Sequence, residues 1–322
     1  MVLLFYLPFI AMVVLANYGE GRRWARFLTY GLLILLNLLI GLVGLLFFLV
    51  QWAAGLPGVQ MPPELEALNF LALGLASLGT AIVAFLPLLP PLRRWLARLI
   101  PIVPASCVHA TALVFAIYLI GGSLATLWTI RFVVEAPEGV SLTPSLFWQQ
   151  GLAFTLLGLA GVGIFLRRDL RGALDRLKLR GVPLPHWGLA AGATLLLLAF
   201  VWVVSFGWSR LWPQSYEEVE RISELLFGEF LSPLGALTLG LSAGIGEELL
   251  FRGALQPRFG LILTTLLFTV AHTQYTVSPA LLEIFVVGLV LGLLRDRAST
   301  TVCILVHAAY NALNVLLAPY FP

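Results

Sequence analysis

The stretch FLTYGLLILLNLLIGLVGLLFFLVQW, residues 27–52, indicates the class of fold most clearly. It is predominantly apolar, carries no charged residue, and exceeds the roughly 20 residues that a helix needs to cross a hydrocarbon core about 30 Å thick. Lipid offers no hydrogen-bond partners to backbone groups, so a segment of this kind crosses a membrane as a helix. We therefore expect a transmembrane helix over these residues.

The rest of the chain repeats this pattern. Of its 322 residues, 60% are hydrophobic and 11% are charged, and the mean hydropathy of +0.98 is far above that of a soluble domain. The predicted fold class is all-α, a polytopic integral membrane helical bundle of about ten transmembrane helices. The first stretch lacks a basic segment before it, so we expect a retained helix rather than a signal peptide. The apolar stretches cover approximately residues 1–18, 27–52, 67–91, 99–130, 147–166, 186–208, 231–256, 259–272, 279–294 and 298–320.

Basic residues in the connecting loops predict the orientation, because Lys and Arg favour the cytoplasmic side of a membrane. Fifteen of them lie in one set of alternate loops, whereas three (Arg131, Arg210 and Arg221) lie in the other. This asymmetry predicts a multi-pass protein of the inner or plasma membrane with both termini outside. It also accounts for the pI of about 9.1 without a nucleic-acid partner. The fifteen are Arg22, Arg23, Arg26, Arg93, Arg94, Arg98, Arg167, Arg168, Arg171, Arg176, Lys178, Arg180, Arg258, Arg295 and Arg297.

Two polar segments organise the chain. The loop at about 167–185 ends in GVPLP, residues 181–185, and predicts a boundary between an N-terminal membrane bundle of about five helices (1–180) and a C-terminal membrane bundle (181–322). The second segment, 214–230, places Val219, Ile222, Leu226 and Phe230 on one face of a Glu-rich helix. It is expected on the outer membrane surface, either as a cap on the bundle or as a lid over a substrate entrance.

Charged residues inside the predicted spans are confined to two of them. Each costs at least ~2.5–3.5 kcal/mol at the bilayer centre, so such residues indicate a function. Stretch 231–256 contains Glu247, Glu248 and Arg252, and stretch 279–294 contains Glu283 near its outer end, where we expect it to be solvated. Glu248 and Arg252 are four residues apart and can pair on one helix face. Glu247 is rotated by about 100° and needs another partner.

Histidines in the neighbouring spans are candidates for that partner. At 1.5 Å rise per residue, Glu247 lies ~15 Å above a tight connection near Pro257, and His272 lies ~22 Å above it. His307 and Asn311, also four apart, lie about 15–21 Å above a second connection near Arg297. These groups therefore converge at one depth in the membrane. Two pairs of glycines with small-xxx-small spacing allow the helices to approach closely, Gly240 with Gly244 and Gly288 with Gly292.

Three ordered motifs resemble those of a known family. GEELLFRG (246–253), FTVAH (268–272) and HAAYN (307–311) are similar to the EExxxR, FxxxH and HxxxN motifs of the CPBP family, the CAAX proteases and bacteriocin-processing enzymes. The resemblance covers about 231–316. It implies a glutamate-dependent intramembrane endopeptidase acting on a membrane-associated protein or peptide. Since hydrolysis requires water, we expect the active site to open toward the cytoplasm, and we expect no bound organic cofactor.

The resemblance also implies the roles of individual residues. Glu247 matches the general base and His272 the residue that helps it to hold and activate water. His307 and Asn311 match the pair that stabilises the tetrahedral oxyanion, and Glu248 and Arg252 match supporting positions.

Three other functions fit parts of the pattern. Glu247, His272 and His307 could bind zinc and leave a fourth position for water, although the HExxH motif is absent. Intramembrane acids and histidines also occur in transporters, which normally carry polar groups in both halves of the chain. A membrane scaffold without catalysis is the third alternative.

Overall fold

The computed structural model describes residues 2–62, 65, 68–134 and 143–320, and within these ranges it consists of helices without a β-strand. The longer helices that form the bundle are α1 (Val2–Gly19), α2 (Arg23–Ala54), α4 (Phe70–Phe85), α6 (Cys107–Val134), α7 (Pro144–Gly161), α9 (Leu184–Leu211), α11 (Pro233–Glu247), α12 (Gln256–Val270), α13 (Pro279–Arg297) and α14 (Thr300–Leu317). The shorter elements are η1 (Leu86–Leu88), α5 (Pro90–Leu96), α8 (Leu170–Arg176), α10 (Pro213–Phe227), η2 (Gly228–Phe230), η3 (Glu248–Leu255), η4 (Thr273–Tyr275) and η5 (Ala318–Tyr320).

The chain is an integral membrane protein built as a polytopic helical bundle. Seven helical stretches of the described chain are long and apolar enough to cross a membrane. Large apolar side chains on α2 point away from the bundle, with Phe27, Leu38 and Leu49 all more than half exposed. Such a surface suits lipid and not water. The predicted number of ten spans stays a prediction, because α7 and α13 are not among the seven stretches and α11 and α12 lie within a single one, Pro233–Val270.

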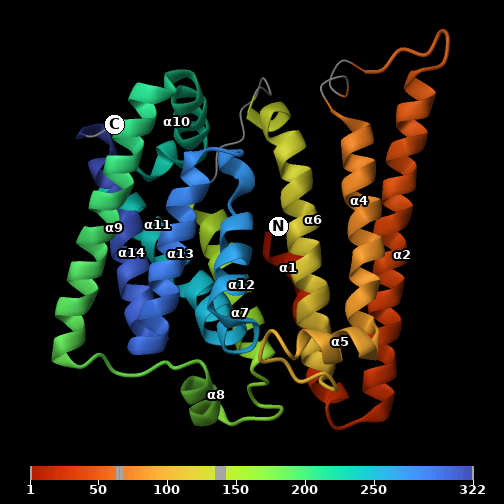
Figure 1. The fold of residues 1–322 in the computed structure, drawn as a ribbon, viewed down its shortest axis with the longest axis horizontal. Helices are drawn as coiled ribbons and strands as arrows, with labels where there is room; N and C mark the ends of the chain where they lie inside the picture. Colours follow the sequence, from red (N-terminus) through yellow and green to blue (C-terminus); the bar gives the residue numbers. More distant parts are fainter. Residues whose placement is uncertain (1, 63–64, 66–67, 135–142, 321–322) are drawn as a thin grey trace.

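The basic segments gather at one end of the bundle. Figure 1 places the α1–α2 connection, α5, α8 and the α13–α14 connection at this end, and α10 at the opposite end. The alternation predicted from the loop charges is therefore present in the fold. The α10 helix also has the predicted buried face, formed by Val219, Ile222 and Leu226 and continued by Phe230 of η2.

Several predicted boundaries differ from the observed ones. Residues 99–106 precede α6 as turns and irregular chain, and not as the start of a span, because Pro101 and Pro104 interrupt the helix. The connection predicted near Pro257 is observed slightly later in the chain: Pro257 lies in the first turn of α12, and the break in the helix falls at Gly260, whose φ of 77° suits glycine. Residues 1 and 67, which begin two predicted stretches, lie outside the described part of the chain.

Glycines bring the central helices into backbone contact. A Cβ atom on Gly240 of α11 would lie 2.4 Å from the carbonyl oxygen of Ala308 on α14, and one on Gly244 would lie 3.1 Å from the Ala308 nitrogen. A Cβ atom on Gly292 of α13 would lie 2.3 Å from Leu261 of α12. The close approach predicted from the small-residue spacing is thus observed between the backbones of α11 and α14, whereas the atom nearest to Gly292 belongs to the Leu261 side chain.

The same kind of contact joins α7 to α11. A Cβ atom on Gly246 would lie 2.6 Å from Cα of Gly151, and one on Gly158 would lie 3.0 Å from the carbonyl oxygen of Leu249. The predicted division of the chain near residue 180 stays a prediction. α7 precedes that division and nevertheless packs directly against the helix that carries the two adjacent glutamates.

Candidate active site

The polar residues of the candidate site begin where α11 changes its helical pitch. Glu247 is the last residue of α11, and the next eight residues, Glu248–Leu255, form the π-helical segment η3. π-Helical turns are rare and frequently occur at functional sites. The segment was not predicted from the sequence, because the spacing of Glu248 and Arg252 suits an ordinary α-helix equally well.

Glu248 lies at the centre of a buried polar cluster. Its Oε2 lies 3.4 Å from Nε of Arg252, and its Oε1 lies 2.8 Å from Nδ1 of His307 on α14. The side chains of Glu248 and Arg252 are 0% and 1% exposed, so the surrounding bundle shields both charges from solvent. The structure thus brings Glu248 and Arg252 together as their spacing predicts, and adds His307 as a second partner.

Arg252 makes two further contacts, one with α13 and one with α12. Its Nη2 donates a hydrogen bond of 3.2 Å to the carbonyl oxygen of Gly288. Its guanidinium carbon lies 4.4 Å from the centroid of the Phe268 ring, a cation–π contact. The absence of a side chain on Gly288 matters here, since a Cβ atom would lie 3.1 Å from Phe268.

Glu247 points to a different partner, as its rotation relative to Glu248 predicts. Its Oε2 lies 3.9 Å from Nε2 of His272, which follows α12. The other ring nitrogen of His272, Nδ1, lies 2.7 Å from the carbonyl oxygen of Phe268. Because a carbonyl oxygen only accepts, Nδ1 carries a proton, and in the neutral tautomer that this bond selects, Nε2 presents a lone pair toward Glu247.

The distance between these two groups has a chemical consequence. A direct hydrogen bond is about 2.7–3.2 Å long, so Oε2 and Nε2 do not bond to each other. Two hydrogen bonds of about 2.8 Å that meet at roughly a right angle span about 4 Å. The two acceptors are therefore spaced to hold both protons of one water molecule. Glu247 Oε2 is also buried without a hydrogen-bond partner among the described residues.

Phe268 connects the two halves of the cluster. Its ring centroid lies 4.8 Å from that of His272 and 5.9 Å from that of His307, and the side chain is 2% exposed. A rigid aromatic ring between both imidazoles and Arg252 fixes their relative positions. The first residue of the FTVAH stretch thus has a packing role that the sequence did not indicate.

Asn311 stands one helical turn beyond His307 on α14. It is half-buried, and within the part of the chain that the structure describes its carboxamide makes no hydrogen bond. The backbone contact of Gly240 and Gly244 with Ala308 holds this turn of α14 against α11. Glu247, Glu248, His272 and His307 therefore meet through measured contacts, whereas no contact places Asn311 among them.

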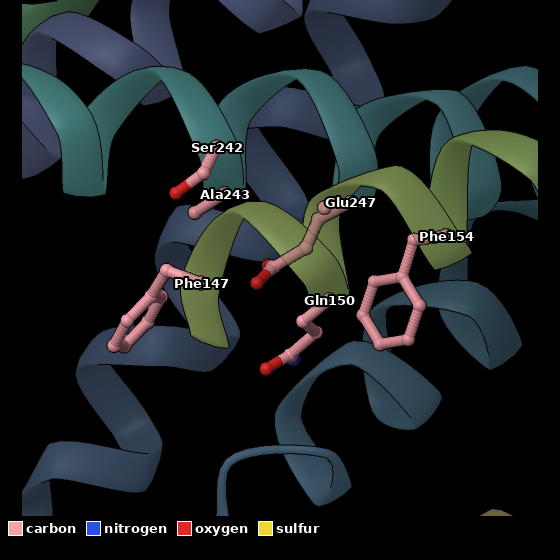
Figure 2. Close-up of a pocket in the computed structure, with 7 residues that line it drawn as sticks. Phe147, Gln150, Phe154, Ser242, Ala243 and Glu247 are labelled. Atoms are coloured by element: carbon pink, nitrogen blue, oxygen red, sulfur yellow. The ribbon is translucent and has the colours of Figure 1, made fainter. Parts of the chain in front are cut away.

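A small cavity lies beside Glu247, between α7 and α11. Its volume is about 10 Å³, close to what one water molecule requires. Phe147, Gln150, Gly151 and Phe154 of α7 and Ser242, Ala243 and Glu247 of α11 line it. Figure 2 shows the carboxylate of Glu247 and the carboxamide of Gln150 extending into the space between the two phenylalanine rings.

The α7 residues are the part of the site that sequence reasoning missed. Gly151 and Gly158 are seven residues apart, and both contact the α11–η3 backbone. This spacing places two small residues on one helix face, which is the signal that could have indicated a close helix partner. Nothing in the sequence indicates which helix that partner is.

Glu283 does not have the predicted solvated position. Its side chain is 9% exposed, and the Ser205 hydroxyl on α9 donates a 3.0 Å hydrogen bond to its Oε1. The prediction was wrong because α9 packs along α13 and covers its outer end.

The three residues that could serve as ligands in the zinc alternative do not form one group. His307 Nδ1 contacts Glu248 and not Glu247, so the set of Glu247, His272 and His307 is divided between two neighbouring pairs. Across the described residues, no three His, Cys, Asp or Glu side chains form a group that could hold a metal ion.

Comparison with known proteins assigns the part of the chain that carries this site to a family. Residues 229–313 match the family model described as type II CAAX prenyl endopeptidase Rce1-like, and these residues carry every member of the polar cluster described above. The chain belongs to the CPBP family. Membership of the CPBP family points to a protease, a peptide hydrolase, and implies a membrane-associated protein as its substrate.

Two bacterial relatives extend the similarity beyond the CPBP domain. The chain is 30% identical over 207 residues to an uncharacterized 24.3 kDa protein of Escherichia coli, which covers 59% of this chain and 89% of that protein. It is 30% identical over 139 residues to the uncharacterized protein YpbD of Bacillus subtilis, which covers 42% of this chain and 69% of that protein. No solved structure matches the chain.

The length of the first match bears on α7. Any continuous stretch that covers 59% of the chain contains its middle, and α7 lies there. The similarity to the E. coli protein therefore includes α7, although the CPBP family model begins only at residue 229.

Proposed function

We propose that the protein is an intramembrane endopeptidase in which Glu247 acts as the general base on a water molecule that His272 helps to hold. The observation that carries this proposal is the 3.9 Å separation of Glu247 Oε2 from His272 Nε2 next to a cavity of water size. The substrate is a membrane-associated protein or peptide, and the reaction is hydrolysis of one of its peptide bonds.

The reaction uses one water and one peptide bond. Glu247 takes a proton from the water while His272 Nε2 accepts a hydrogen bond from its other O–H, and the water oxygen forms a bond to the carbonyl carbon. The C=O π electrons move to the oxygen. Glu247 then gives its proton to the amide nitrogen as the C–N bond breaks, so that the products are a carboxyl group and an amine.

His307 and Asn311 are proposed to stabilise the oxyanion. With both ring nitrogens protonated, His307 Nδ1 donates to Glu248 and leaves Nε2–H for the substrate oxygen. Glu248 would stabilise the positive charge of that ring, and Arg252 would prevent Glu248 from carrying an uncompensated charge. The free carboxamide of Asn311 is the second proposed donor.

A cleavage assay in the presence of chelators tests this proposal against the zinc alternative. The purified protein in lipid vesicles should cleave at least one peptide from a panel of single-span membrane peptides, as detected by mass spectrometry. Because the proposed base is a carboxylate, activity should stay within about twofold of its initial rate after treatment with EDTA and 1,10-phenanthroline. Loss of cleavage that added zinc restores would instead support the metalloprotease.

The orientation is proposed from the loop charges. A reporter fused after residue 175, in the basic segment of α8, should report the cytoplasm, and one inserted near residue 218, in α10, should report the outside. Both termini would then lie outside, with the site reached by water from the cytoplasm. The reverse pattern of the two reporters would contradict this orientation.

A further inference from the structure

The residues that line the α7 side of the Glu247 cavity precede the part of the chain that the family model matches. Three side chains of α7 form this side, Phe147, Gln150 and Phe154, whereas the family model covers residues 229–313. Gln150 is the polar one, and it lies between two phenylalanine rings (Figure 2).

The crossing of the two helices fixes Gln150 opposite Glu247. Gly151 and Gly246 are in backbone contact, and a Cβ atom on Gly151 would lie 2.5 Å from the carbonyl oxygen of Ser242. Gln150 and Glu247 are the immediate neighbours of this glycine pair. Because the backbones at the crossing have no room to shift, the two side chains keep their relative position in the cavity.

The carboxamide of Gln150 is not used by the protein. Within the described chain it makes no hydrogen bond, in contrast to Gln149, whose Oε1 accepts from the Leu3 nitrogen of α1. A carboxamide offers two donors and an acceptor. Placing these groups at membrane depth without a partner has a free-energy cost, which a ligand with matching groups would offset.

A substrate of an intramembrane protease supplies such groups. A peptide bond becomes accessible to water only when the substrate helix opens locally, and each opened residue exposes an N–H and a C=O group that lipid cannot satisfy. A carboxamide beside the proposed base can bond to both kinds of group. The rings of Phe147 and Phe154 flank it with apolar surface for the side chains of the same segment.

We propose that Gln150 is a substrate-binding residue, whose carboxamide hydrogen-bonds to the backbone of the unwound peptide segment that Glu247 hydrolyses. The inference rests on the proposed function. It assigns part of the binding site to α7, and so explains why α7 packs against the catalytic helices through glycines.

The test replaces Gln150 by Met, which keeps the length of the side chain and removes its hydrogen-bonding groups. Leaving buried peptide groups of the substrate unpaired should lower kcat/KM by about tenfold or more, mainly through KM. The matched control is Gln149→Met on the same helix, which should stay within about twofold of the parent. Equal kinetics of Gln150→Met and the parent, or an equal loss in both variants, would overturn the proposal.

Binding to an inactive background separates this inference from the proposed function. A membrane peptide that the parent cleaves, or a fluorescent peptide of the same panel if none is cleaved, is titrated into Glu247→Gln protein in vesicles. Adding Gln150→Met should raise its Kd by about tenfold, and an unchanged Kd would refute the role of Gln150. Failure of the parent to cleave any peptide would instead count against the proposed function, whatever the Kd values show.

Discussion

Replacing Glu247 by Gln is expected to lower kcat by about 10²–10⁴-fold while the protein stays folded. Gln has nearly the same size and can occupy the same position at the end of α11, but its amide cannot take a proton from water. The Glu248 cluster should be undisturbed, because Glu247 contacts His272 and not Arg252 or His307. Initial cleavage rates in vesicles and thermal unfolding in detergent measure the two effects.

The matched control for this variant is Glu283→Gln. Glu283 is another buried carboxylate of the same bundle, and the Ser205 hydroxyl can donate to a Gln oxygen as it does to the carboxylate. This variant should cleave within about twofold of the parental rate. A Glu247→Gln protein that cleaves at the parental rate would rule out Glu247 as the base.

The second large effect is expected on stability. Replacing Glu248 by Gln leaves the Arg252 guanidinium buried without its counter-ion, and stranding one member of a buried pair costs about 3–5 kcal/mol of the free energy of unfolding. The remaining contacts of Arg252, with the Gly288 carbonyl and the Phe268 ring, do not neutralise its charge. Reversible unfolding in mixed micelles measures the change.

The double variant Glu248→Gln with Arg252→Gln tests the cause. Removing both charges should restore part of the lost free energy of unfolding, since neither member of the ion pair is then left without its counter-ion. The control is Glu217→Gln on the exposed face of α10, which should change stability by no more than about 0.5 kcal/mol. Equal stability of Glu248→Gln and the parent, or a double variant less stable than either single variant, would refute the ion-pair account.

The sequence predicted those parts of the fold and site that depend on spacing along one helix. The four-residue separation of Glu248 and Arg252 predicted their contact, and the rise per residue predicted that Glu247 and His272 meet at one depth. Hydropathy predicted the helical membrane bundle for the same reason, because crossing a bilayer fixes the length and composition of a segment.

The features that were missed depend on packing between distant segments. The burial of Glu283 follows from α9 lying along α13, and the bond of His307 to Glu248 follows from the rotation of α14 about its axis. Two local backbone conformations were also not predicted. The π-helical segment 248–255 and the break at Gly260 instead of Pro257 are choices among backbone conformations that the same residues permit.

The contribution of α7 to the site was only partly predictable from the sequence. Its two glycines indicate a close partner, but only the fold identifies α11 as that partner and brings Gln150 to the cavity of Glu247. A division of function at residue 180 predicted from loop composition does not capture such a contact.

Peptide hydrolysis by Glu247 is tested by comparing protein N-termini in membranes of the native host. A strain without its own copy of the protein receives either the parental chain or Glu247→Gln at equal amounts, and new N-termini are identified by mass spectrometry. If Glu247 is the base, new N-termini in or next to apolar segments of membrane proteins should arise with the parental chain and be lost with Glu247→Gln. The same set of N-termini in both strains would contradict peptide hydrolysis by Glu247.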